Sequence, residues 1–269
     1  MPDDIPVWRC SGGSVAEVRD SVAIEEPMEI RVNAESLAVT MRTPGDDFDL
    51  TAGLLFTEGL IHSQSDLIVM KRDADPENPD RENIVLTAIK PCDTPGARST
   101  GERTFLSSSS CGVCGKKDLA SIRTLTTPIP ASEFRVAATT VYGLNETMRR
   151  AQRVFETTGG LHAAALFDRN GMLLFLREDI GRHNAVDKLI GAELLAGRVP
   201  LTDRLMMISG RASFEILQKA AVARLPILCA VSAPSSLAVQ MARDLNMTLI
   251  GFLRGETMNI YAGAERIVF

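Results

Sequence analysis

Strand and helix patterns alternate along the second half of the chain, and this alternation limits the folds open to it. The expected strands and helices, in chain order, span residues 183–195, 204–208, 213–224, 227–231, 235–245 and 248–253. Strands joined through helices run parallel in one sheet, and the helices cover the faces of that sheet. We therefore expect a parallel or mixed sheet, with edge strands at residues 258–261 and 266–269.

The segment before this alternation has a different pattern. Residues 162–167 and 172–176 flank Asp-Arg-Asn-Gly, a hairpin signal. Asn145 is placed to cap a helix that runs to Phe155, and the two glycines at 159 and 160 would end it. The sequence thus adds a helix and a hairpin to the predicted sheet.

The first part of the chain predicts a smaller α+β unit. Its expected strands span residues 21–24, 28–32, 37–41, 67–71 and 84–89. A helix capped by Asp46 or Asp47 is expected to run to Thr57, with leucines on its buried side. Residues 1–18 have the composition of a polar tail.

Composition excludes several classes of protein. The net charge of −5 argues against a general nucleic-acid binder, and no apolar run approaches the ~18 residues that a bilayer requires. The N-terminus lacks the basic and apolar segments of a secretory signal. Five cysteines, three of them widely scattered, do not form a disulfide framework, so we expect a reducing cytoplasm.

Two cysteines close in sequence, Cys111 and Cys114, lie in a C-x-x-C motif after a long stretch without apolar periodicity, residues 91–110. Such a pair can hold a metal, close a redox disulfide or supply a reactive thiolate. The adjacent lysines at 116 and 117 would stabilise a thiolate. The motif is a weak signal by itself, because half of a structural zinc site has the same spacing.

Three turns that follow strands and open helices form a second candidate site. They span residues 178–184, 209–213 and 232–236. In open α/β sheets, ligands bind outside the carboxyl ends of the strands, where helix N-termini attract anions. An anionic, nucleotide-like ligand fits, although glycine and serine are also ordinary turn and cap residues. The candidate residues in the first two turns are Gly181, Arg182, His183, Ser209, Gly210 and Arg211, and Arg254 is a further phosphate-binding candidate.

The histidines in these segments have different expected roles. His183 begins a helix and is the better functional candidate, whereas His162 lies in an apolar strand and reads as a satisfied, partly buried residue.

In order along the chain, these segments resemble the formate dehydrogenase accessory sulfurtransferases (FdhD/NarQ). The resemblance rests on residues 31–33, 41–44 through 58–59, 111–116, 158–162, 178–185, 209–211 and 251–254. Together these stretches cover nearly the whole chain and are specific as an ordered set. Ala34, where the family often has glycine, is a small departure that affects only a turn.

The resemblance implies a cytoplasmic sulfur carrier and sulfurtransferase. It would take persulfide sulfur from a cysteine desulfurase and deliver it to the molybdenum bis(guanine dinucleotide) cofactor, which then enters the formate dehydrogenase apoenzyme. The cofactor is a bound substrate, and no permanently bound metal is expected. The resemblance also implies a homodimer.

The resemblance further implies a C-terminal domain of cytidine-deaminase-like topology, a three-layer α/β/α sandwich. The expected division is an α+β domain over residues 1–98, a mobile C-x-x-C loop over 99–118 and the α/β domain over 119–269. By family position, Cys111 bears the persulfide and Cys114 would assist. The implied cofactor-binding stretch is Phe252, Leu253, Arg254, Gly255, Glu256 and Thr257.

Three other readings of the cysteine motif compete with a sulfur carrier. A zinc deaminase needs a histidine or cysteine two residues before a glutamate, and a P-C-x-x-C pair. Here Cys111 follows Ser110, and no histidine has glutamate at the second position after it. A zinc-binding scaffold would contain stoichiometric metal. A thioredoxin-like reductase would place the motif directly after a core strand.

Overall fold

A six-stranded mixed sheet forms the centre of the larger part of the protein, in a computed structural model that describes residues 3–74, 83–90, 126–130 and 134–269. Its strands are β8 (His162–Phe167), β9 (Leu173–Asp179), β10 (Leu205–Ile208), β11 (Ile227–Ala230), β12 (Thr248–Arg254) and β13 (Thr257–Ala262). Their order in the sheet is β13-β12-β11-β10-β8-β9. β10, β11 and β12 are parallel, and the other pairs are antiparallel. The prediction of a mixed sheet is confirmed.

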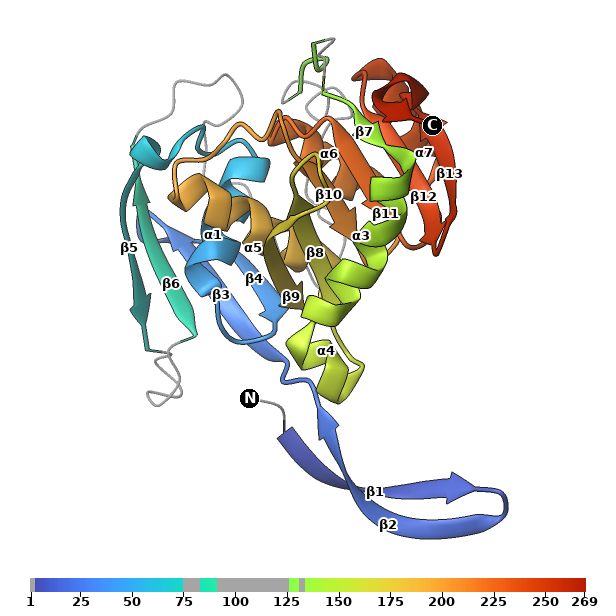
Figure 1. Cartoon of the computed structure of the whole chain (residues 1–269). Helices are drawn as coiled ribbons and strands as arrows, with labels where there is room; N and C mark the ends of the chain where they lie inside the picture. Colours follow the sequence, from blue (N-terminus) through green and yellow to red (C-terminus); the bar gives the residue numbers. More distant parts are fainter. Residues whose placement is uncertain (1–2, 75–82, 91–125, 131–133) are drawn as a thin grey trace.

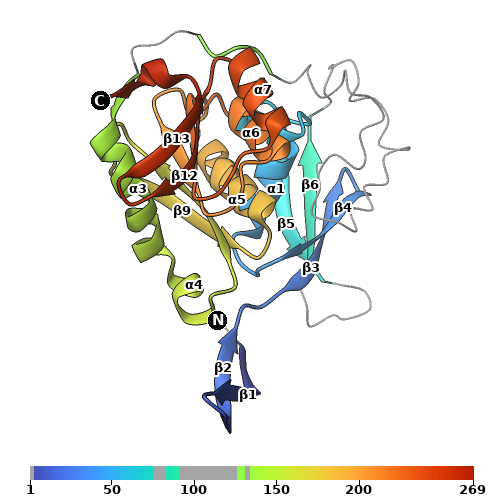
Figure 2. The ribbon, with the colours of Figure 1, turned by 90° about the vertical axis from the view of Figure 1, so that its right-hand side faces the viewer.

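Helices cover both faces of this sheet (Figure 2). One face carries α3 (Ala138–Ala151), and the other carries α5 (Arg182–Leu195), α6 (Phe214–Val222) and α7 (Ser236–Asp244). Side chains alternate accordingly, because Ala163 and Ala165 pack in the cluster with α3, while Ala164 and Leu166 pack in the cluster with α5. The mixed α/β class is confirmed, and the likeness to cytidine deaminases stays a prediction.

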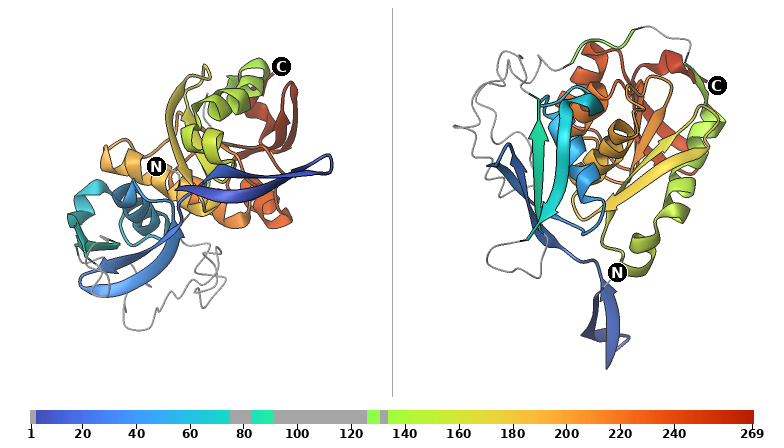
Figure 3. Two further views of the ribbon diagram at one scale, coloured as in Figure 1. Left: turned by 90° about the horizontal axis from the view of Figure 1, so that it is seen from below. Right: turned by 90° about the vertical axis from the view of Figure 1, so that its left-hand side faces the viewer.

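A four-stranded sheet with one helix forms the smaller part. It contains β3 (Glu26–Val32), β4 (Glu35–Arg42), β5 (Leu67–Asp73) and β6 (Ile84–Ile89), in the order β4-β3-β6-β5. A short 3-10 turn, η1 (Gln64–Asp66), precedes β5. Helix α1 (Asp47–Thr57) lies between this sheet and α5 (Figure 3). One apolar cluster includes Ile30, Leu55 and Leu189, so the core continues from the smaller sheet into the larger part.

Two glycines let α1 and α5 cross in direct backbone contact. A Cβ added to Gly53 would lie 1.9 Å from the carbonyl oxygen of Asp187, and one added to Gly191 would lie 1.8 Å from that of Asp49. Any side chain at either position therefore forces the two helices apart. This crossing joins the two parts of the protein.

Replacing Gly53 by alanine is expected to lower the free energy of unfolding by about 3 kcal/mol, because the new methyl group meets backbone atoms. Urea unfolding followed by circular dichroism measures the change. Gly143→Ala is the matched control, since Gly143 lies inside α3 and a Cβ there meets nothing within 4 Å. The control should be stabilised by about 0.5–1 kcal/mol. Equal stability of Gly53→Ala and wild type would contradict the close crossing.

Two sequence-based predictions of local structure are wrong. Residues 1–18 are not a polar tail, because β1 (Asp3–Ser11) and β2 (Ser14–Val22) form a hairpin that projects from the body of the protein (Figure 1). The expected helix from Asn145 to Phe155 instead begins at Ala138 and ends at Ala151. It begins earlier because Val141, Leu144 and Met148 form a buried stripe.

A second, short helix follows this one. Helix α4 (Arg153–Thr158) comes after Gln152 and ends at Gly159, which has a left-handed backbone as predicted. The chain closes with η3 (Ala264–Arg266) and β14 (Ile267–Val268), which pairs with β7 (Val136–Ala137). A helix expected over 119–125 and the boundaries at 98 and 118 lie outside the described residues, so the domain division stays a prediction.

Candidate functional site

Five chain segments meet at one edge of the larger sheet. β10, β11 and β12 are parallel, so their carboxyl ends share that edge. β8 is antiparallel to β10 and begins there, and β9, which pairs His162 with Asp179, ends there. The three predicted turns and the turn after β12 therefore lie along a single edge, where open α/β sheets bind ligands.

A cavity of about 790 Å³ opens at this edge. Helices α3 and α4 form one wall, and residues 159–162 another. The ends of the parallel strands contribute Ser209, Val231 and Gly255. Cavities of this size are typical of sites for small molecules and cofactors.

Some predicted ligand residues border the cavity or lie beside it. Ser209 and Gly255 are part of its wall. Gly210 lies next to two other site residues, since a Cβ placed on it would be 3.5 Å from Nδ1 of His162 and 3.6 Å from Cβ of Arg182. The Arg182 Nε is buried and has no hydrogen-bond partner among the described residues. The arginine thus keeps a donor beside the cavity.

Other predicted residues are not in the wall of this cavity, as far as the described chain shows. They are Gly181, His183, Arg211, Phe252, Leu253, Arg254, Glu256 and Thr257. Their turns surround the cavity without forming its surface. Phe252 nevertheless has a left-handed backbone, with φ of 53°, and is 40% exposed. This conformation is uncommon for a bulky residue and is found mainly where function requires it.

His162 borders the cavity, although the sequence interpretation favoured His183. Its Nδ1 lies 3.4 Å from the hydroxyl oxygen of Ser209, which accepts a hydrogen bond from the Ala163 amide at 2.9 Å. Burial lowers the pKa of His162, and the nearby charges of Arg182 and His183 lower it further. His162 is therefore a neutral hydrogen-bonding group near pH 7. Its position at the start of a strand at the ligand-binding edge was the signal that could have found it.

The wall from α3 and α4 was not predicted from the sequence either. It contributes Arg149, Gln152 and Phe155, and the Arg149 guanidinium lies 4.3 Å from the centre of the Phe155 ring. Such cation–π packing holds both side chains against each other. Gln152 is 2% exposed. These residues give the cavity a positive charge and an aromatic surface.

His183 instead belongs to a small cluster at the starts of α5 and α6. Its Nε2 lies 3.4 Å from Ser213 Oγ and 3.7 Å from a carboxylate oxygen of Glu215. The hydrogen bond from His183 lowers the pKa of Glu215 from 4.5 to about 2, against the opposing effect of burial. This pair fixes the start of one helix against the other.

The low pKa of Glu215 predicts an acid-sensitive contribution to stability. Between pH 4.5 and about 2 the unfolded chain binds this proton and the folded chain does not, so stability falls as pH falls through that window. Above the window, Glu215→Gln should lower the free energy of unfolding by about 2 kcal/mol. Urea midpoints at pH 6, 4 and 3 test this. A pH dependence as steep as that of wild type would contradict it.

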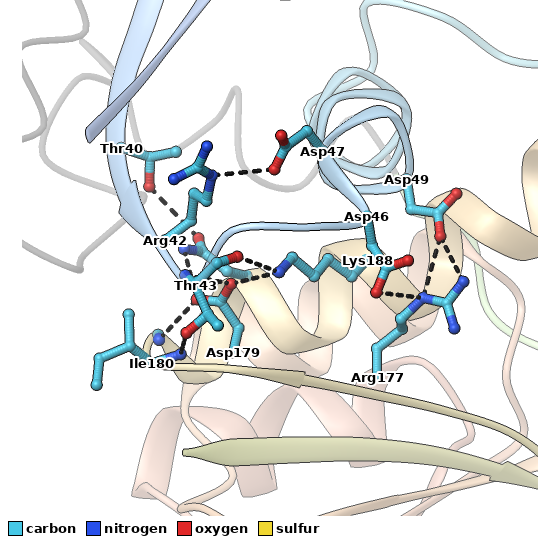
Figure 4. Close-up of polar contacts among 12 residues, drawn as sticks. Thr40, Arg42, Thr43, Asp46, Asp47, Asp49, Arg177, Asp179, Ile180 and Lys188 are labelled. Atoms are coloured by element: carbon cyan, nitrogen blue, oxygen red, sulfur yellow. Dashed lines mark hydrogen bonds and ion pairs between the residues drawn. The ribbon is translucent and has the colours of Figure 1, made fainter. Parts of the chain in front are cut away.

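A buried polar network holds the first turn of the site against the smaller sheet (Figure 4). Asp179 accepts hydrogen bonds from the backbone amides of Thr43 at 3.1 Å and Gly181 at 2.8 Å, and pairs with Lys188 at 2.7 Å. The Ile180 amide donates to the Thr43 hydroxyl. The residue after β4 and the turn that precedes Arg182 are thereby fixed together.

Cysteines and metal-binding groups complete the inventory. Cys111 and Cys114 lie outside the described residues. Of the described cysteines, Cys10 is exposed on the hairpin, and Cys229 is buried with its pKa raised to about 12 by burial. Within the described ranges, no three histidine, cysteine or acidic side chains are grouped as metal ligands, and no helix is long and apolar enough to cross a membrane.

The fold and the site together define a mixed α/β protein with a ligand cavity at the carboxyl ends of its parallel strands. The sequence profile of the FdhD/NarQ family matches residues 23–268. The chain belongs to this family. The hairpin at residues 3–22 lies before the matched region.

Similar proteins agree with this assignment. A Streptomyces coelicolor protein named sulfur carrier protein FdhD is 48% identical over 269 residues, covering 97% of this chain and 94% of its own. A Mycobacterium tuberculosis protein of the same name is 46% identical over 267 residues, covering 97% and 96%. A crystal structure of a putative formate dehydrogenase accessory protein from Desulfotalea psychrophila superposes with a TM-score of 0.77 at 23% identity, over the full length of both chains, and supports the fold.

Proposed function

We propose that this protein is a sulfur carrier in the maturation of formate dehydrogenase. The observation that carries the proposal is the nearly full-length match, at 46–48% identity, to proteins named sulfur carrier protein FdhD. The family match over residues 23–268 supports the same conclusion.

The sulfur is carried as a persulfide on Cys111. The Cys111 thiolate attacks the outer sulfur of a persulfide on a cysteine desulfurase, the desulfurase thiolate leaves, and Cys111 becomes the persulfide. No net oxidation occurs in this exchange. Its rate depends on the thiolate fraction, which the neighbouring lysines at 116 and 117 raise. Buried Cys229, with a pKa of about 12, is unsuited to this role.

The acceptor is the molybdenum bis(guanine dinucleotide) cofactor, bound as a substrate at the cavity. What supports this placement is the cavity volume of about 790 Å³ and the cationic groups of Arg149 and Arg182 in or beside it. Guanidinium groups bind phosphate oxygens well. The turn containing Gly255 reaches the same cavity. The sulfurated cofactor then passes to the formate dehydrogenase apoenzyme in the cytoplasm, and the carrier acts as a homodimer.

Intact-mass measurement tests the proposal. The protein is incubated with a cysteine desulfurase and cysteine, and its mass should rise by one sulfur atom and return to the original value after reduction. Stoichiometric zinc without any sulfur adduct would overturn the proposal and favour a metal-binding scaffold.

A further inference from the structure

Gln152 is a buried polar residue in the cavity wall whose hydrogen-bonding capacity is not used. It borders the cavity at the junction of α3 and α4 and is 2% exposed. Its amide nitrogen has no hydrogen-bond partner among the described residues. A buried donor without a partner is costly, and most such groups in proteins are paired. The exception calls for an acceptor that the cavity receives.

The neighbouring side chains indicate the shape of that acceptor. Tyr142 and Phe155 border the same cavity, and the Arg149 guanidinium packs on the Phe155 ring. Aromatic faces and guanidinium planes bind flat ring systems by stacking. The apolar side chains of Met148 and Val231 exclude water from the same space. A planar heterocycle with a hydrogen-bond acceptor on its rim fits these walls.

We infer that Gln152 determines which ring the cavity accepts, by donating from its amide nitrogen to a ring carbonyl of a bound nucleotide. A ring with an amino group at that place presents a second donor and leaves the glutamine unpaired. The cavity therefore selects an oxo-purine or a similar ring over adenine. The inference rests on the proposed function, because it takes the nucleotide part of the cofactor as the ligand.

Gln218 provides a matched control elsewhere in the protein. It is 5% exposed, lies on α6, and its amide nitrogen also lacks a partner among the described residues, but it does not border the cavity. Gln152→Leu and Gln218→Leu remove the same buried amide. Only the first change should alter ligand binding, whereas a general effect on stability would follow both.

Calorimetric titration of the full-length protein with GDP, IDP and ADP tests the inference. Wild type should bind GDP and IDP, which carry a ring carbonyl, about tenfold or more tightly than ADP, which carries an amino group. Gln152→Leu should lose most of this preference, and Gln218→Leu should keep it. If Gln152→Leu unfolds, Gln152→Asn, which shortens the amide, should give the same loss of preference.

The outcomes separate this inference from the proposed function. Undiminished preference in the Gln152 variants, or no difference among the three nucleotides in wild type, would overturn the role of Gln152. Persulfide loading, measured by intact mass in the same preparations, should remain normal in every variant. Absence of loading with a Gln152-dependent preference intact would overturn the sulfur-carrier function alone.

Discussion

Replacing Cys111 by alanine is expected to abolish sulfur transfer. Alanine has no group that can form a persulfide, so neither loading from a desulfurase nor delivery to the cofactor can occur. Formate dehydrogenase activity in cells that lack the native carrier should remain at the background level when the variant is supplied. The same variant should show no sulfur adduct by intact mass.

Two other cysteine variants separate a specific role from a general one. Cys114→Ala should load sulfur but turn over less completely, because the second thiol of the motif assists exchange rather than carrying the sulfur. Cys10→Ser is the matched control, since Cys10 is exposed on the projecting hairpin. It should support full activity. Normal activation of formate dehydrogenase by Cys111→Ala would overturn the assignment.

The larger sheet was predictable because its signals are local. Each strand from β10 to β12 is a short apolar run, and each helix between them shows a helical period, so order and connection follow from the chain. The hairpin at residues 3–22 was missed because its strands are polar and exposed on both faces. Strands without a buried face lack the period on which such predictions depend.

The candidate site was predictable only in part, for a related reason. Ser209 and Gly255 follow strands directly, so their place at the sheet edge follows from topology. Gln152 and Phe155 come from helices that precede the whole sheet, and their approach depends on tertiary packing. Gln152 in particular reads as one member of a helical stripe, and its buried amide is visible only in the folded structure.

The second large effect is expected at the buried pair of Lys188 and Asp179. Lys188 is 1% exposed, and its ammonium group donates to the Asp179 carboxylate at 2.7 Å and to the Thr43 carbonyl at 2.8 Å. Asp179 has no exposed surface and also accepts from the backbone amides of Thr43 and Gly181. Removing the lysine charge leaves an uncompensated carboxylate in the core.

Lys188→Met should therefore lower the free energy of unfolding by about 3–5 kcal/mol, the usual range for breaking a buried ion pair. It should also weaken nucleotide binding at temperatures where the variant remains folded, because Asp179 fixes the turn that precedes Arg182. Urea unfolding and calorimetry measure the two effects.

Two comparisons show whether the loss comes from the unpaired charge. The double variant Lys188→Met with Asp179→Asn removes both charges and keeps an oxygen acceptor for the Thr43 and Gly181 amides, so it should be more stable than Lys188→Met alone. Arg9→Met removes an exposed pair with Asp20 on the hairpin and should change stability by less than about 1 kcal/mol. A double variant less stable than Lys188→Met would show that Asp179 acts mainly through its backbone hydrogen bonds.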